Sequence, residues 1–266
     1  MTDPLLRQEL LDPDVLSGLL ETDWVGRTLH TYRTLPSTNA HLLSMAEEAP
    51  PGAVIVAEEQ TGGRGRLGRR WEAPPFRALL FSVLFRPAGG VGDAALATLT
   101  AGIAVAEAIA RQGGPPARIR WPNDLVVGDR KVCGILSEYS SRGPSLVVGI
   151  GLNVNQTDQE LPPGAASLRS CAGRPLSRAP LLAAILSGLE VWWNRMVREG
   201  FGPIRERAED LSSLIGRSVT LDLGEKKVEG IATGIGAGGG LLIGVGRERK
   251  EYFTGEVVRV RPLATE

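Results

Sequence analysis

The sequence predicts an α+β protein with one large domain and a small C-terminal β-barrel. Continuous apolar runs at 53–59 and 78–86 indicate buried strands, and apolar residues recur at helical spacing over 93–111 and 180–198. From Gly216 the pattern changes to short strand candidates about 8 to 12 residues apart, which is typical of a small barrel. We expect an N-terminal segment at 1–26, a main domain at 27–215 and a barrel at 216–266.

The composition is that of a globular protein of a reducing cytoplasm. The chain has 266 residues, of which 42% are hydrophobic and 23% charged, and 30 basic residues balance 30 acidic ones. This balance provides no global field that would attract a polyanion. No apolar run approaches the ~18 residues that span a bilayer, and no signal peptide is recognised, so no membrane partner is expected. Two cysteines and two histidines argue against a disulfide framework and a zinc cluster.

The elements of the first half follow from apolar spacing and from helix and turn signals. Ser37 or Thr38 is a suitable N-cap for the helix that follows, and Pro50-Pro51-Gly52 ends that helix. The expected order is a short helix at 13–20, a strand at 27–35, a helix at 39–48, strands at 53–59 and 78–86, a loop around Gly89 to Gly92 and a helix at 93–111.

The second half begins with a hairpin, because Gly128-Asp129 lies between two apolar runs. Its strands are expected at 125–127 and 131–139, followed by a strand at 146–150, a loop at 156–178 and helices at 180–198 and 202–213. The barrel strands are expected at 217–223, 226–233, 241–245, 250–254 and 257–260.

The segment Gln60–Trp71 carries the strongest functional signal. Residues 62–71 contain four glycines and four arginines. Glycine allows close backbone approach to a ligand, and arginine offers a planar fork of donors for phosphate or carboxylate. A solvated loop and a nucleic-acid contact are the alternatives. We favour a small anionic ligand, because the loop lies between two predicted core strands and the chain is neutral.

Three further polar clusters lie at predicted strand ends and loops, and each has a plain structural interpretation too. Ser37-Thr38-Asn39 fits helix capping alone. Lys131, near Asn123-Asp124, fits a surface cation at a turn. Asn153 and Asn155 follow a predicted strand and fit an ordinary turn. Neither histidine has a recognisable partner motif, so the clusters favour stabilisation of negative charge over acid–base chemistry.

Taken together, these motifs closely resemble those of the biotin protein ligases, over about residues 28 to 262. The residues that carry the resemblance are Ser37-Thr38-Asn39, Gln60-Thr61-x-Gly63-Arg64-Gly65-Arg66-x-Gly68-Arg69-x-Trp71, Trp121-Pro122-Asn123-Asp124, Lys131-x-x-Gly134-Ile135-Leu136-x-Glu138 and Gly149-x-Gly151-x-Asn153-x-Asn155. The arginine block is highly specific when Trp-Pro-Asn-Asp follows it at this distance.

The resemblance implies a fold, an activity and a site. The fold would be a mixed sheet flanked by helices, as in class II synthetases, with an SH3-like barrel. Biotin would be activated by ATP, with Mg²⁺, to biotinyl-5′-AMP and transferred to a lysine of a biotin carboxyl carrier protein of acetyl-CoA carboxylase. The implied biotin residues are Ser37, Thr38, Asn39, Gln60, Arg64, Gly65, Arg66, Lys131 and Gly134. The implied nucleotide residues are Arg64, Arg66, Arg69, Trp71, Asn123, Lys131, Asn153 and Asn155.

The implied catalytic residues are Lys131, Arg66 and Asp124. Mg²⁺ would be held mainly by the ATP phosphates, and Asp124 would serve either Mg²⁺ or the acceptor amine. Arg120 stands where members of the family usually have lysine. Because about 25 residues precede the first predicted strand, too few for a helix-turn-helix domain, we expect no DNA operator binding. A homodimer through a sheet edge is plausible.

Two other functions fit part of the sequence. A lipoate–protein ligase would share the general fold and the adenylating lysine but lacks the arginine block. An RNA-binding module would use the arginine loop and the barrel, and the neutral net charge argues against it.

Overall fold

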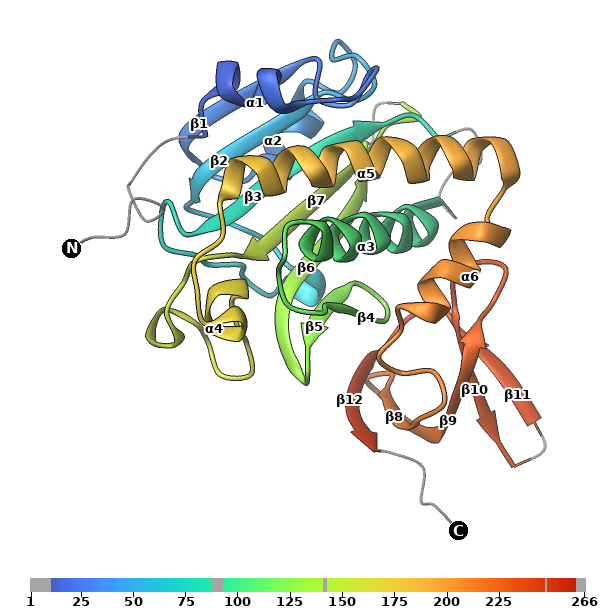
Figure 1. The fold of residues 1–266 in the computed structure, drawn as a ribbon. Helices are drawn as coiled ribbons and strands as arrows, with labels where there is room; N and C mark the ends of the chain where they lie inside the picture. The colour runs from blue at the N-terminus through green and yellow to red at the C-terminus, as the bar shows by residue number, and fades with distance from the viewer. Residues whose placement is uncertain (1–10, 88–92, 141–142, 247, 262–266) are drawn as a thin grey trace.

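Two β-sheets form the framework of this computed structural model, which describes residues 11–87, 93–140, 143–246 and 248–261 (Figure 1). The larger sheet has seven strands in the order β1-β2-β3-β7-β6-β5-β4. They are β1 (Leu29–Leu35), β2 (Val54–Gln60), β3 (Ala78–Phe85), β4 (Arg118–Arg120), β5 (Asp124–Val127), β6 (Arg130–Tyr139) and β7 (Leu146–Asn153). Strands β1 and β2 are parallel and the other neighbours are antiparallel, which confirms the mixed sheet.

Helices cover both faces of this sheet. The long helices α3 (Asp93–Arg111) and α5 (Arg178–Glu199) pack on one face, with α1 (Pro13–Leu19) beside α5 (Figure 1). Helix α2 (Thr38–Ser44) packs on the other face, against β2, β3 and β7. All eight residues of β3 are buried, because both faces of this central strand are covered.

Helix α3 corrects one expectation from the sequence. Its segment Ala94–Arg111 reaches 18 residues at a mean hydropathy of 1.4, so an apolar run of membrane-spanning length does exist. Two-thirds of this segment (67%) is buried inside the protein, where it packs against α5, α6 and β6. The apolar residues of α3 therefore form the core of the main domain rather than a clear membrane span.

The C-terminal segment forms a five-stranded antiparallel sheet in the order β11-β10-β9-β8-β12. Its strands are β8 (Ser218–Asp222), β9 (Lys227–Ile235), β10 (Leu241–Val245), β11 (Glu248–Tyr252) and β12 (Glu256–Arg261). This arrangement fits the expected SH3-like fold, although the described residues of β11 and β12 do not pair to close a barrel. The domain boundaries at 26/27 and 215/216 stay predictions.

Buried polar contacts attach the second sheet to the main domain. The Trp121 indole Nε1 donates to the Gly239 carbonyl at 2.9 Å, and the Ile235 amide donates to Glu209 Oε1 at 2.7 Å. Glu209 lies on α6 (Gly202–Asp210), the helix that precedes β8. These contacts hold the second sheet beside the main domain, and Glu256 of β12 accepts a hydrogen bond from Arg69 of the main domain. Residues of both segments can therefore contribute to one site.

Several elements differ from the expected ranges for local reasons. Helix α2 ends at Ser44, and Arg86 Nη2 donates to the Ala46 and Ala49 carbonyls just beyond it. Strand β7 extends to Asn153 because β3 and β6 pair with it along that length. The expected loop at 156–178 contains a 3₁₀ turn (Asp158–Glu160) and α4 (Leu168–Ala172), which a Ser167–Ser170 capping box begins. Strand β4 was not expected, and the loop at Gly89 to Gly92 lies outside the described residues.

Candidate functional site

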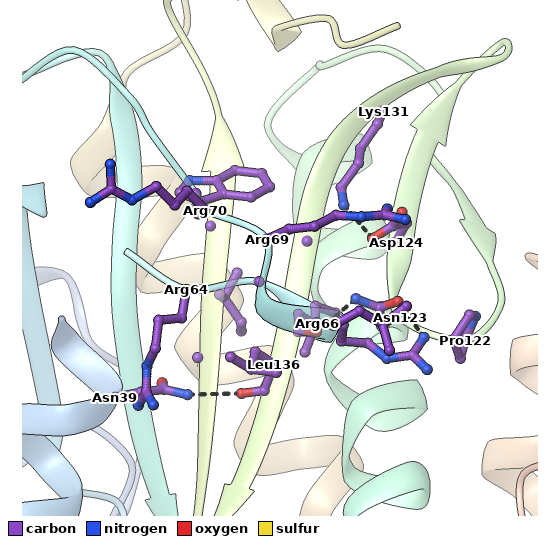
Figure 2. Close-up of a pocket in the computed structure, with 18 of the residues that line it drawn as sticks. Asn39, Arg64, Arg66, Arg69, Arg70, Pro122, Asn123, Asp124, Lys131 and Leu136 are labelled. Carbon is purple, nitrogen blue, oxygen red and sulfur yellow. Dashed lines mark hydrogen bonds and ion pairs between the residues drawn. The ribbon is translucent and has the colours of Figure 1, made fainter. Parts of the chain in front are cut away.

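A pocket of about 300 Å³ opens above β6 and β7, beneath the arginine loop (Figure 2). Its walls come from the start of α2, the end of β2, the loop before β3, the β4–β5 turn and the start of β12. Most of the predicted site residues meet there: Ser37, Thr38, Asn39, Gln60, Arg64, Gly65, Arg66, Arg69, Trp71, Asn123, Asp124, Lys131 and Gly134. The residues that line the pocket run from Ser37 to Val257, so segments 220 positions apart in sequence are brought together.

Glycines form the floor of this pocket. Gly134 of β6 and Gly151 of β7 are directly paired, and the Trp71 indole lies against both of them. A Cβ atom at Gly151 would overlap the indole, and one at Gly134 would lie 2.8 Å from it. A Cβ at Gly149 would overlap the side-chain amide of Asn39 in the same way. The absence of a side chain at these three positions thus makes room for the Trp71 indole and the Asn39 amide.

We expect Gly149→Ala to weaken ligand binding in this pocket by about tenfold, because the new methyl group displaces the Asn39 amide and the geometry of bound groups is sensitive to shifts near 1 Å. Calorimetric titration with biotin, the ligand that the sequence resemblance implies, measures the change. Gly18→Ala is the matched control, because nothing lies within 4 Å of a Cβ there. Unchanged affinity in Gly149→Ala would show that Asn39 has room to move.

The pocket is strongly cationic. Arg64, Arg66, Arg69, Arg70, Arg120 and Lys131 line it, against the two carboxylates of Asp124 and Glu256. A ligand that carries negative charge would balance this excess.

Most of these cations already have a fixed protein partner. Lys131 Nζ lies 2.6 Å from Asp124 Oδ1, and Arg66 Nη1 donates to Asn123 Oδ1 at 3.1 Å (Figure 2). Arg64 Nη2 lies 3.1 Å from Glu138 Oε1, and Arg69 Nη1 donates to Glu256 Oε1 at 2.9 Å. Such pairs fix where each cation points before a ligand enters.

Burial and neighbouring charges act against each other at Arg66. Burial lowers the pKa of its guanidinium, while the carboxylates of Asp124 and Glu256 raise it. A partly desolvated cation of this kind interacts more strongly with a phosphate than a fully solvated one does. Lys131 lies close by, with its Nζ 5.5 Å from the centre of the Trp71 ring.

Two donors in the pocket wall have no hydrogen-bond partner among the described residues, namely Trp71 Nε1 and Arg120 Nε. Buried polar atoms are normally paired. Two orphaned donors beside a cationic pocket fit a ligand rich in hydrogen-bond acceptors, such as a nucleotide or a carboxylate.

Glu256 brings the second sheet into the site. The hydrogen bond from Arg69 lowers the pKa of the Glu256 carboxyl and, by the same contact, raises the pKa of Arg69. A depressed carboxyl pKa contributes stability above the ordinary value of 4.5, and that contribution is lost as pH falls through the depressed value.

Accordingly, we expect the melting temperature of wild type to exceed that of Glu256→Gln above about pH 5 and to converge with it as the solution is acidified below pH 4.5. Thermal denaturation across this range measures the difference. A difference that is independent of pH would mean that Glu256 acts through packing and not through its charge.

At the start of α2, Ser37 is the N-cap and accepts a hydrogen bond from the Ala40 amide. Gln60 Oε1 accepts from the Thr38 amide at 2.7 Å, so the Gln60 Nε2 end points away from α2. Asn39 is buried and uses both of its side-chain N–H groups within the protein, on the Leu136 carbonyl and Glu138. The structure therefore places Asn39 as a support of the pocket wall.

Asn153 and Asn155 lie apart from the other predicted residues and are not among the described residues that line the pocket. Asn153 Nδ2 donates to the Ala166 carbonyl at 3.1 Å. Asn155 exchanges two hydrogen bonds with the backbone of Leu176. Both amides fasten the 156–178 segment to the end of β7, and their expected contact with nucleotide stays a prediction.

Four residues of the site and its wall were not among the expected site residues, namely Ser82, Arg70, Glu138 and Gly149. The sequence does contain a signal for Ser82, because it is a lone hydroxyl residue inside the apolar run 78–85, and the structure shows it fully buried. Glu256 lies one residue before the strand that the sequence predicts at 257–260, and it is the first residue of β12. Its contact with Arg69 depends on how the two sheets meet, which local sequence does not encode.

Known proteins with similar sequences are ligases whose substrates would suit a cationic pocket of this kind. The biotin/lipoate A/B protein ligase family model matches residues 31–155. The biotin–[acetyl-CoA-carboxylase] ligase of Mycobacterium tuberculosis is 34% identical over 271 residues, covering 97% of both chains. The bifunctional ligase/repressor BirA of Escherichia coli is 32% identical over 94% of this chain and 78% of BirA.

The same relationship holds in three dimensions. The biotin protein ligase from Aquifex aeolicus, solved in complex with biotin and ATP, superposes with a TM-score of 0.77 at 31% identity, covering 89% of this chain and 99% of that one. The identities, the coverage and the shared fold together show that the chain belongs to the biotin protein ligase family.

Proposed function

We propose that this protein activates biotin with ATP and transfers it to a lysine of a biotin carboxyl carrier protein. The observation that carries the proposal is the cationic pocket beneath the arginine loop, which holds Lys131 and Arg66 beside Asp124 over a floor of glycines. Family membership supplies the reaction that such a pocket serves.

In the first step, an oxygen of the biotin carboxylate attacks the α-phosphorus of ATP, and pyrophosphate leaves. The two reactants are both anions and repel each other in solution. Arg66 and Lys131 would bind the carboxylate and the α-phosphate, hold them at attack distance and stabilise the extra charge on the phosphorus. Arg69 lies beside this position on the same loop, and Arg64 lies at the Asn39 end of the pocket.

In the second step, the amine of the acceptor lysine attacks the acyl carbon of biotinyl-5′-AMP, and AMP leaves. The attacking amine must lose a proton, and Asp124 is the nearest carboxylate to Lys131 in the pocket. We infer that Asp124 either orients the acceptor amine or assists Mg²⁺. An Asp124→Asn enzyme with wild-type rates in both half-reactions would exclude both roles.

Mg²⁺ would enter with ATP and be held mainly by the phosphates, which is its usual mode in nucleotide sites. No cluster of three or more histidine, cysteine or acidic side chains suited to a metal occurs within the described residues. The ion would therefore be held by the phosphates, joined by Asp124 if that residue serves Mg²⁺ and not the acceptor amine. It would neutralise part of the triphosphate charge.

Mass spectrometry of a carrier domain, incubated with this protein, biotin and MgATP, tests the whole reaction. We expect a gain of one biotinyl group on one lysine, and biotin-dependent exchange of labelled pyrophosphate into ATP. Replacing biotin by lipoate separates the two activities that the matching family contains. Exchange with lipoate and none with biotin would assign the protein to the lipoate ligases instead.

The proposed setting is a soluble cytoplasmic enzyme with the carrier protein as its macromolecular partner. The expectations of no operator DNA and of a homodimer through a sheet edge stay predictions. A gel shift with biotin-operon DNA and sedimentation of the protein with and without biotin and ATP measure them.

A further inference from the structure

A continuous chain of hydrogen bonds runs from the core of the sheet to the arginine loop. Ser82 is fully buried in β3, and its hydroxyl donates to Asn39 Oδ1 at 2.6 Å. Asn39 Nδ2 donates to Glu138 Oε2 at 2.7 Å. Arg64 Nη2 in the loop lies 3.1 Å from the other oxygen of Glu138, Oε1, and also donates to Oε2 at 3.3 Å. Three segments far apart in sequence are thus joined through one carboxylate.

The orientation of the Asn39 amide is determined by its neighbours. Its Nδ2 faces two acceptors, Glu138 and the Leu136 carbonyl at 3.1 Å, so its Oδ1 must face the Ser82 hydroxyl. The amide also lies flat against Gly149, where a Cβ atom would overlap it. With both N–H groups used, Asn39 has none to offer a ligand, and its influence on the site passes through Glu138.

The two halves of the loop are held at different ends of the pocket. Arg64 is paired at the Asn39 end (Figure 2), next to Ser37 and Thr38 at the start of α2. Arg66 and Arg69 are paired with Asn123 and Glu256 at the opposite end, near Lys131. A change at Glu138 therefore alters the first half of the loop without directly altering the second.

We propose that Glu138 is a positioning residue that fixes Arg64 over the end of the pocket where the biotin ring binds. The proposal rests on the proposed function, because it assigns the Asn39 end to biotin and the Lys131 end to the reacting phosphate. Glu138 does not touch the reacting atoms. It holds Arg64 in place before biotin arrives, and it is itself held by Asn39 and Ser82.

The variant Glu138→Gln tests this division. Glutamine keeps an acceptor for Asn39 Nδ2 but presents a neutral amide to Arg64, so the ion pair is lost while the wall remains. We expect the KM for biotin to rise about tenfold, which matches one charge-assisted hydrogen bond, with the KM for ATP and kcat each within about twofold. Pyrophosphate exchange at varied biotin and varied ATP gives both values.

Glu72→Gln is the matched control, because it removes a carboxylate paired with another arginine of the same loop, Arg70, at 3.8 Å on the exposed surface. We expect wild-type kinetics from it. The double variant Glu138→Gln with Arg64→Ala should show the biotin KM of Arg64→Ala alone, because Glu138 acts through Arg64.

The outcomes of these experiments distinguish the positioning role of Glu138 from the proposed biotin ligase activity on which it depends. Absence of biotin-dependent exchange in the wild type overturns both. If the wild type does catalyse exchange, three results overturn only the positioning role of Glu138. They are an unchanged biotin KM in Glu138→Gln, an equal rise in the KM values for biotin and ATP, and additive effects in the double variant. A melting temperature within a few degrees of wild type verifies that Glu138→Gln is folded.

Discussion

Replacing Lys131 by methionine should lower the rate of biotinyl-5′-AMP formation by about a thousandfold, at the upper end of what one charge-stabilising donor contributes. Lys131 Nζ lies 2.6 Å from Asp124 and close to Arg66. Methionine removes the positive charge and leaves the Asp124 carboxylate beside the position of the incoming phosphate. The lost attraction between Lys131 and the phosphate and the new repulsion between Asp124 and the phosphate both raise the energy of the transition state. The fall should appear mainly in kcat, because the charge on phosphorus grows as the transition state forms.

Two further variants make this result specific. Lys227→Met removes a lysine that also faces an aspartate, Asp222 at 3.8 Å, but on the exposed C-terminal sheet, and it should leave the rate unchanged. Lys131→Met combined with Asp124→Asn should be faster than Lys131→Met alone, because the uncompensated carboxylate is gone. A folded Lys131→Met enzyme that keeps its rate within threefold of wild type would exclude Lys131 from the chemical step.

The sequence predicts which residues line the pocket better than it predicts where each helix and strand begins and ends. Helix α3 was predicted at its observed bounds because its apolar residues recur at helical spacing over the whole length. The arginine loop stands out because glycines and arginines are concentrated in it, whereas the other site residues were expected from the family resemblance, and their roles stay predictions. Strand β4, with three residues, exists through its pairing with β5 and through the backbone of 211–213, which no local pattern reveals.

What the sequence does not contain is the network of contacts between distant segments. Asn39 looks like a helix cap or a ligand donor in sequence, and only its contacts with Ser82 and Glu138 show that it is a support. Asn153 and Asn155 also look like ligand-binding amides in the sequence, because their partners in the folded protein lie further along the chain. Their partners, Ala166 and Leu176, lie in a segment that was predicted to be a simple loop.

The largest expected loss of stability comes from Arg178→Met. Arg178 begins α5 and forms an ion pair with Glu58 of β2, and their side chains are only 8% and 2% exposed. Glu58 also accepts a hydrogen bond from the Leu11 amide at 2.8 Å, and Arg178 donates to the Ala78 carbonyl at 3.1 Å. The pair thus joins the N-terminal segment, two strands and a helix at one buried point.

Removing one member of a buried pair leaves the other charge without compensation in a medium of low polarity. We therefore expect Arg178→Met to lower the free energy of unfolding by about 3–5 kcal/mol, measured by urea denaturation. Arg195→Met, which breaks the half-exposed Arg195–Glu199 pair on the same helix, should cost less than about 1 kcal/mol. Arg178→Met with Glu58→Gln should be less damaging than Arg178→Met alone, because no bare carboxylate remains. If the single and double variants lose the same stability, the cost arises from packing around α5 and not from the unpaired charge.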